Sequence, residues 1–113
     1  MSQITTHVLD TAAGKPGKGI SIRLMKNEND NWLVIAEGIT NADGRVSDLL
    51  PAGKILSTGD YRIIFNIGEY YKIQKIKTFY PAVEILFTVF DGNHYHVPLL
   101  ISPYGYSTYR GSY

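Results

Sequence analysis

The chain has 113 residues, of which 44% are hydrophobic and 19% charged, and its 11 basic and 10 acidic side chains give a net charge of +1. This balance is typical of a single globular domain, here spanning residues 1–113, and it excludes an intrinsically disordered chain. It gives no basis for binding nucleic acid or an anionic membrane through bulk charge. The absence of cysteine excludes disulfides, a thiolate nucleophile and cysteine-ligated metal sites.

The amino-terminal residues lack a basic segment followed by an apolar run, and no stretch approaches the roughly 18 apolar residues that a membrane span requires. We therefore expect a soluble, cytoplasmic protein that does not associate with membranes. A periplasmic or peroxisomal location is expected instead if a targeting segment has been removed.

Alternating apolar and polar residues, interrupted by clusters of Gly, Pro, Asn and Asp, predict a series of short strands. The predicted strands cover residues 3–10, 20–25, 32–39, 45–50, 60–67, 83–90, 95–101 and 104–109. In the first strand, Thr5, His7 and Leu9 share one face because strand side chains alternate with a period of two. The Asn-Ala-Asp-Gly turn at 41–44 delivers Arg45 to the start of the next strand.

Residues 69–77 are the helical candidate, because Tyr70, Ile73 and Ile76 recur at helical spacing. A helix of about two turns depends on packing for its stability. Short strands without an alternating βαβ pattern predict an all-β fold, namely a two-sheet antiparallel β-sandwich of about eight strands with one short helix.

The strand at 95–101 separates two sets of side chains, one facing the core and the other facing away from it. The core set is Tyr95, Val97, Leu99 and Ile101, and the opposite set is His96, Pro98 and Leu100. Pro98 cannot donate a backbone hydrogen bond, which indicates an edge, a bulge or a strand position without a ladder partner on that side.

The histidines His7, His94 and His96 are the side chains that titrate near neutrality. Each alone could be a hydrogen-bonded packing residue, whereas a histidine pair together with Arg45 favours a functional site. A zinc site is an alternative, although the spacing of His94 and His96 offers no firm third ligand. A serine triad is disfavoured because no GxSxG elbow occurs and Ser112 lies in the tail.

Two arginines could clamp a planar anionic ligand by forked hydrogen bonds, and these are Arg45 and Arg110. Tyr109 could add an aromatic or hydroxyl contact. For the tail at 109–112, composition alone favours a frayed terminus.

Several stretches of the sequence resemble the transthyretin-related family. THVLDTAAGKPGKGI at 6–20 is similar to the first family signature, and YHVPLLISPYGYSTYRGS at 95–112 to the second. TNADGR at 40–45 and FYPAVEILFTV at 79–89 extend the resemblance over nearly the whole chain. The tetrapeptide Tyr-Arg-Gly-Ser at 109–112 resembles the one that marks the 5-hydroxyisourate hydrolases of this family, which the hormone carrier transthyretin lacks.

The resemblance implies a sandwich of two four-stranded sheets, paired edge to edge into dimers and then face to face into a homotetramer whose central channel holds the sites. It implies hydrolysis of the small molecule 5-hydroxyisourate to 2-oxo-4-hydroxy-4-carboxy-5-ureidoimidazoline in urate degradation, with no cofactor and no metal. The implied catalytic residues are His7, Arg45 and His96; the substrate-binding residues are Tyr109, Arg110, Gly111 and Ser112; Pro98 and Leu100 line the channel.

Two alternatives stay open at this point. The first is a transthyretin-like module that binds a small ligand without turnover, and the second is a structural domain whose tail is dispensable. The sequence departs from the family pattern in having Tyr113 after the tetrapeptide, so Ser112 carries no terminal carboxylate. This departure puts any role of a terminal carboxylate on Ser112 in question.

Overall fold

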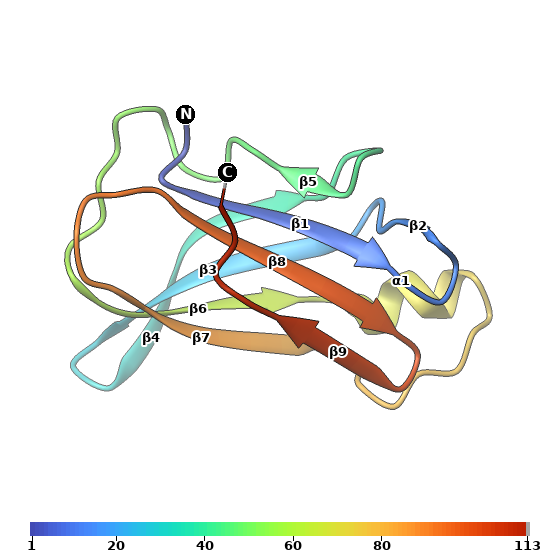
Figure 1. Cartoon of the computed structure of the whole chain (residues 1–113). Helices are drawn as coiled ribbons and strands as arrows, with labels where there is room; N and C mark the ends of the chain where they lie inside the picture. Colours follow the sequence, from blue (N-terminus) through green and yellow to red (C-terminus); the bar gives the residue numbers. More distant parts are fainter. Residues whose placement is uncertain (113) are drawn as a thin grey trace.

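The protein, described here by a computed structural model that covers residues 1–112, forms two packed β-sheets with a short helix at one end (Figure 1). The expectation concerning Tyr113 and its effect on Ser112 lies outside the described residues. The elements are β1 (Ile4–Asp10), β2 (Lys15–Pro16), β3 (Ser21–Glu28), β4 (Asn31–Ile39), β5 (Arg45–Val46), β6 (Gly59–Phe65), α1 (Ile67–Ile73), β7 (Val83–Val89), β8 (Tyr95–Ser102) and β9 (Gly105–Thr108).

The first sheet has the order β2-β1-β8-β9, and β5 pairs with β1 on the same edge as β2. The predicted two-sheet β-sandwich is confirmed, and its pairs are antiparallel with one exception. β1 and β8 run parallel, with Ile4 opposite Tyr95 and Asp10 opposite Ile101. The alternation of side chains predicts which face of a strand is buried but not the direction in which the strand runs, so it could not predict this parallel pair. Parallel strands need a long connection, and here most of the chain lies between β1 and β8.

The second sheet has the antiparallel order β4-β3-β6-β7. Asn29 and Asp30 have positive φ angles of 53° and 66°, which suits the two-residue turn that joins β3 and β4. Both strands extend up to this turn, where Glu28 pairs with Asn31, so the hairpin is tighter than the predicted strands at 20–25 and 32–39 imply.

The predicted strand at 45–50 is reduced to Arg45–Val46. Leu49 and Leu50 turn into the core instead, with exposed fractions of 6% and 4%. The Leu50 N–H donates to the Ser2 hydroxyl at 3.0 Å, so a side chain replaces a ladder partner there.

The helix is displaced from its predicted position, and of its predicted apolar face Tyr70 is confirmed whereas Ile73 and Ile76 are wrong. Its first turn is capped by Asn66, whose side chain accepts a hydrogen bond from the Glu69 N–H at 3.4 Å, and the helix ends at Ile73, before Ile76. Its buried residues are Ile67, Tyr70 and Tyr71, whereas Ile73 is 78% exposed. Ile67, predicted to belong to the preceding strand, supplies the i position of an i, i+3, i+4 face.

The core lies between the two sheets and is built mainly from the inward-facing alternate residues of β1, β3, β6, β7 and β8, whereas β2, β4 and β9 contain no fully buried residue. In β8 the core set is confirmed, because Tyr95, Val97, Leu99 and Ile101 are all buried. Other fully buried side chains include Ile4, Val8, Ile20, Ile22, Leu24, Tyr61, Ile63, Phe65 and Ile67.

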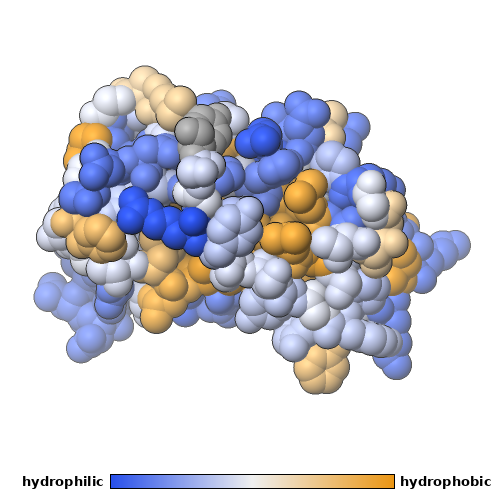
Figure 2. All heavy atoms as spheres, viewed as in Figure 1, coloured by the Kyte–Doolittle hydropathy of each residue, from blue (hydrophilic) through white to orange (hydrophobic). Residues whose placement is uncertain are grey.

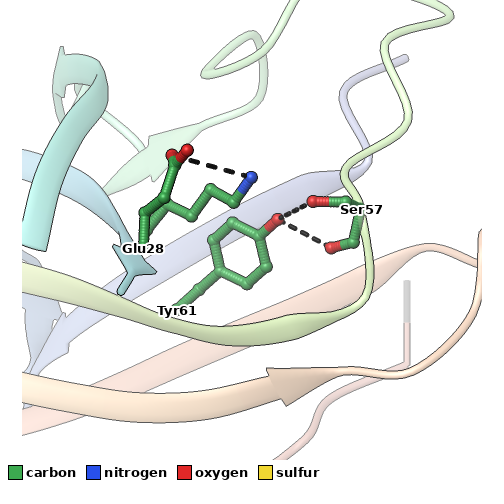
Figure 3. A network of polar contacts seen from close by, with 4 residues as sticks. Glu28, Ser57 and Tyr61 are labelled. Carbon is green, nitrogen blue, oxygen red and sulfur yellow. Dashed lines mark hydrogen bonds and ion pairs between the residues drawn. The ribbon is translucent and has the colours of Figure 1, made fainter. Parts of the chain in front are cut away.

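The face formed by β1, β8 and β9 is largely polar, with apolar atoms gathered near its centre (Figure 2). Tyr61 of β6 belongs to the second sheet, on the far side of the core. Its hydroxyl donates a hydrogen bond to the Ser57 carbonyl, in the loop that precedes β6, at 2.7 Å (Figure 3). The neighbouring pair of Lys26 and Glu28, 4.0 Å apart, lies at the surface with Lys26 partly and Glu28 largely exposed, and it adds little stability. Across residues 1–112, no helix has the length and apolar character needed to cross a membrane.

Candidate functional site

The parallel pairing of β1 and β8 builds the floor of the site. Its register places His7 beside Pro98 and Leu9 beside Leu100, and one pair further back Thr5 lies beside His96. Because paired residues of adjacent strands point to the same face, both rows project outward from the first sheet.

A tight turn brings Arg45 to this floor. The Asn41 side-chain carbonyl accepts hydrogen bonds from the N–H groups of Asp43 at 2.9 Å and Arg45 at 3.0 Å. Gly44 has a φ of 77°, and its carbonyl accepts from the Val8 N–H at 2.7 Å. Arg45 is thereby set opposite His7 in the register of β1 and β5.

The C-terminal tail continues from β9 across the face of β8 (Figure 1). Extending the β8–β9 register by one residue from Leu99 and Thr108 would set Pro98 opposite Tyr109, and Pro98 has no N–H to give. The ladder therefore stops, and it resumes as a single bridge in which the Gly111 N–H donates to the His96 carbonyl at 2.9 Å. The prediction that Pro98 marks a position without a ladder donor agrees with this arrangement.

Gly111 packs directly on the imidazole. A Cβ added at Gly111 would lie 2.7 Å from His96 Cδ2, closer than carbon atoms tolerate, and 3.0 Å from Pro98 Cγ, which is a tight contact. His96 is consequently only 6% exposed although it faces away from the core. The tail is docked on the site, against the tendency of a polar terminus to fray.

These segments enclose a hollow of about 390 Å³ on the outer face of the first sheet. Its lining residues are His7, Leu9, Arg45, His96, Pro98, Leu100, Tyr109 and Ser112. The structure therefore brings together the three predicted catalytic residues, the two predicted lining residues and two members of the tetrapeptide.

Arg110 lies elsewhere. Its guanidinium stacks over the ring of Tyr95 at 4.3 Å and faces Phe90 at 5.5 Å. Its Nη2 is 3.4 Å from the His94 carbonyl. In a single chain, Arg110 lines an adjoining, mainly apolar hollow of about 230 Å³ between β7 and β8. The two hollows share His96 and Tyr109, but Arg110 does not line the one that contains Arg45, so a shared clamp with Arg45 is not formed.

The electrostatics of the hollow favour neutral imidazoles. Burial is the main cause that lowers the pKa of His96, followed by the charge of Arg45 and the neighbouring His94 and His7. Burial and then Arg45 also lower the pKa of His7, against an opposing hydrogen bond to the Asp43 backbone. A neutral imidazole beside a fixed positive charge can take a proton from water and can stabilise a developing negative charge nearby.

Sequence reasoning missed Thr5 as part of the site. Its hydroxyl is 2.8 Å from His96 Nδ1 and 2.9 Å from His94 Nε2, so it joins the two imidazoles. The only signal in the sequence is that Thr5 shares a strand face with His7, and this signal gains meaning only from the β1–β8 register. The metal alternative gains no support, since residues 1–112 contain no group of three His, Cys, Asp or Glu arranged to hold an ion.

Several known proteins are similar to this chain in sequence or in fold. Residues 4–111 match the HIUase/Transthyretin family. The chain is 47% identical over 115 residues to 5-hydroxyisourate hydrolase 2 of Rhizobium meliloti, covering 97% of this chain and 96% of that protein. Among solved structures, 5-hydroxyisourate hydrolase of Klebsiella pneumoniae has a TM-score of 0.85 at 31% identity, covering 96% of this chain and 92% of that one. Sea bream transthyretin in complex with thyroxine has a TM-score of 0.92 at 25% identity, covering 99% and 97%.

Proposed function

This chain belongs to the HIUase/Transthyretin family, and on that basis we propose that it hydrolyses 5-hydroxyisourate to 2-oxo-4-hydroxy-4-carboxy-5-ureidoimidazoline in urate degradation. The observation that carries the proposal is the hollow itself, in which His7 and His96, both with lowered pKa, lie with Arg45. The identity of 47% to a named hydrolase supports the same activity.

The reaction adds one water molecule across a ring amide, breaking the C–N bond. In the proposed mechanism His7 and His96 hold the water, and a neutral imidazole takes one of its protons while the water oxygen attacks the carbonyl carbon. The carbonyl oxygen then carries a negative charge, which Arg45 stabilises. The protonated imidazole returns its proton to the ring nitrogen as the C–N bond breaks.

Tyr109 and Ser112 are proposed to orient the substrate, because they close one side of the hollow. Gly111 contributes by lying flat on His96. The substrate-binding role of Arg110 stays a prediction, since its guanidinium stacks on Tyr95 in the single chain.

A homotetramer built as a dimer of dimers is part of the proposal. It is supported by the transthyretin-like fold, and by β7 and β9, each of which has one paired strand among the described residues. Light scattering coupled to size exclusion tests the assembly by mass. A cytoplasmic location is likewise proposed and is tested by cell fractionation.

The competing function is that of a carrier that binds a small ligand without turnover, and the transthyretin-like neighbour solved with thyroxine makes it a specific alternative. The test follows the ultraviolet absorbance of freshly generated 5-hydroxyisourate with and without the protein. We expect the protein to accelerate the decay. Saturable binding of substrate or of an aromatic ligand, with a decay rate equal to that in buffer, would support the carrier instead.

A further inference from the structure

A buried hydroxyl links the histidine of the hollow to a second histidine outside it. Thr5 is 1% exposed, and its Oγ1 atom lies 2.8 Å from His96 Nδ1 and 2.9 Å from His94 Nε2. The two imidazole rings are nearly parallel, with an interplanar angle of 18° and centroids 6.3 Å apart. The three side chains therefore form a continuous polar chain across the β1–β8 pair.

The single hydroxyl hydrogen of Thr5 limits how the three side chains can be hydrogen-bonded to one another. A threonine hydroxyl has a single proton to donate, so it can donate to one imidazole nitrogen while it accepts an N–H from the other. If Thr5 donates to His96, the His96 proton lies on Nε2; if Thr5 donates to His94, His96 keeps its proton on Nδ1. The position of the proton on one histidine is thus coupled to that on the other through Thr5.

We propose that Thr5 is a positioning residue whose hydroxyl accepts a hydrogen bond from the Nδ1–H group of His96 and donates a hydrogen bond to Nε2 of His94, so that Nε2 of His96 carries the lone pair. This inference rests on the proposed function, because the lone pair is what makes His96 a base in the hollow. The hydrogen bond that one ring nitrogen makes decides which nitrogen is basic.

The proposed function selects this direction over the reverse one, because the Thr5 hydroxyl lies at Nδ1 of His96, so that Nε2 is the ring nitrogen that can act as the base. Burial, and after it the charge of Arg110, lower the pKa of His94, which favours the neutral ring that can accept from Thr5. The parallel register sets Thr5 directly beside His96, where the hydroxyl reaches Nδ1 without any rearrangement.

In this arrangement Arg110 acts on His94, outside the hollow. Its stacking on Tyr95 and its contact with the His94 carbonyl hold a positive charge beside His94. The tetrapeptide at 109–112 therefore contacts both histidines that Thr5 joins, because Gly111 packs on His96 and Arg110 lies beside His94.

The test measures the tautomer of His96 directly by nitrogen-15 NMR of the imidazoles, with the His96 signals assigned by comparison with His96→Gln. In the wild type we expect a proton on Nδ1 and none on Nε2. Thr5→Val keeps the shape of the side chain and removes the hydroxyl, and we expect it to produce a mixture of both tautomers. Thr5→Ser, which retains the hydroxyl, should restore the wild-type tautomer.

Kinetics supply the second readout. Loss of the correct tautomer should lower kcat of Thr5→Val about 10- to 100-fold, with KM almost unchanged. This loss is smaller than the roughly 100- to 10,000-fold that general base catalysis contributes, because part of the population keeps the correct tautomer. Thr5→Ser should recover most of the activity. A wild-type proton on Nε2, or a Thr5→Val protein with an unchanged tautomer, would overturn the proposal even if activity fell.

His94 provides a separate arm of the same test. His94→Gln retains an oxygen acceptor for the Thr5 hydroxyl and should preserve the His96 tautomer, whereas His94→Leu should not. Equal tautomer populations in these two variants would contradict the coupling. If the wild-type protein fails to accelerate substrate decay, the proposed function is wrong, and the tautomer measurement still decides the role of Thr5.

Discussion

Gly44 occupies a backbone position that suits no other residue type. Its φ of 77° lies in the left-handed region, and an added Cβ would clash with the Val8 carbonyl oxygen. The tight turn that this glycine allows is what sets Arg45 opposite His7.

Gly44→Ala should therefore destabilise the protein by more than the cost of backbone strain alone, which is about 1–3 kcal/mol. Urea denaturation measures the free energy of unfolding. Gly14→Ala is the matched control, because Gly14 also has a positive φ, of 67°, and a Cβ added there would have no described atom within 4 Å. Equal losses in the two variants would mean that the close approach to Val8 is unimportant.

Burial lowers the pKa of His7 and His96, and the positive charge of Arg45 lowers both pKa values further. Removing that charge should raise the pKa of both imidazoles towards their ordinary value, without fully restoring it, because burial remains. The acid limb of the pH profile of kcat/KM should accordingly move to higher pH in Arg45→Ala. Arg23→Ala, at an exposed arginine on the other sheet, should leave the limb in place. An unmoved limb in Arg45→Ala would show that Arg45 does not tune these histidines.

The segment that follows β9 is a docked tail and not a further strand. Its attachment rests on the bridge between Gly111 and His96 and on the absence of a side chain at Gly111. The ladder of β8 and β9 alone could not hold it, because Pro98 interrupts the hydrogen bonding.

Gly111→Ala should displace the tail and lower kcat/KM, by about 10-fold or more if Tyr109 and Ser112 orient the substrate. Stability should change little, because most tail residues are exposed. Gly105→Ala serves as the control, since a Cβ there would meet only Ser102 Oγ at an ordinary 3.5 Å. Full activity in Gly111→Ala would favour a dispensable tail.

Strand identity and the faces of β1 and β8 could be predicted from the sequence because alternation with a period of two is a local property. The parallel pairing of these strands could not, since it depends on a connection through the second sheet. The helix was misplaced for a related reason: Ile73 and Ile76 matched a helical spacing, whereas the Asn66 cap and contact with the core selected Ile67 and Tyr71.

The site was predictable as a set of residue types and less so as an arrangement. His7, Arg45 and His96 meet as expected, yet the positions of Arg110 and Thr5 depend on contacts between distant segments. Arg110 prefers the faces of Tyr95 and Phe90, and Thr5 enters the site only through the register of β1 with β8.

The three histidines link the folding of the entire chain to pH. Folding lowers the pKa of His7, His94 and His96 below the ordinary value of 6.5, so below that pH the unfolded chain binds more protons than the folded one. Stability should be complete above about pH 6.5 and should fall as the pH decreases through the folded pKa values. Urea midpoints at pH 7.5 and pH 5.5 test this, because most carboxylates titrate at lower pH. A midpoint that is constant or higher at pH 5.5 would refute it.

The hollow containing His7, Arg45 and His96 is assigned the hydrolysis of 5-hydroxyisourate. The sharpest test of this assignment is kcat/KM for this substrate in His96→Ala, measured beside the wild type and the Arg23→Ala control. We expect a loss of about 100-fold or more in His96→Ala, as when a general base is removed, and wild-type values in the control. Equal kcat/KM in all three proteins would contradict the assignment.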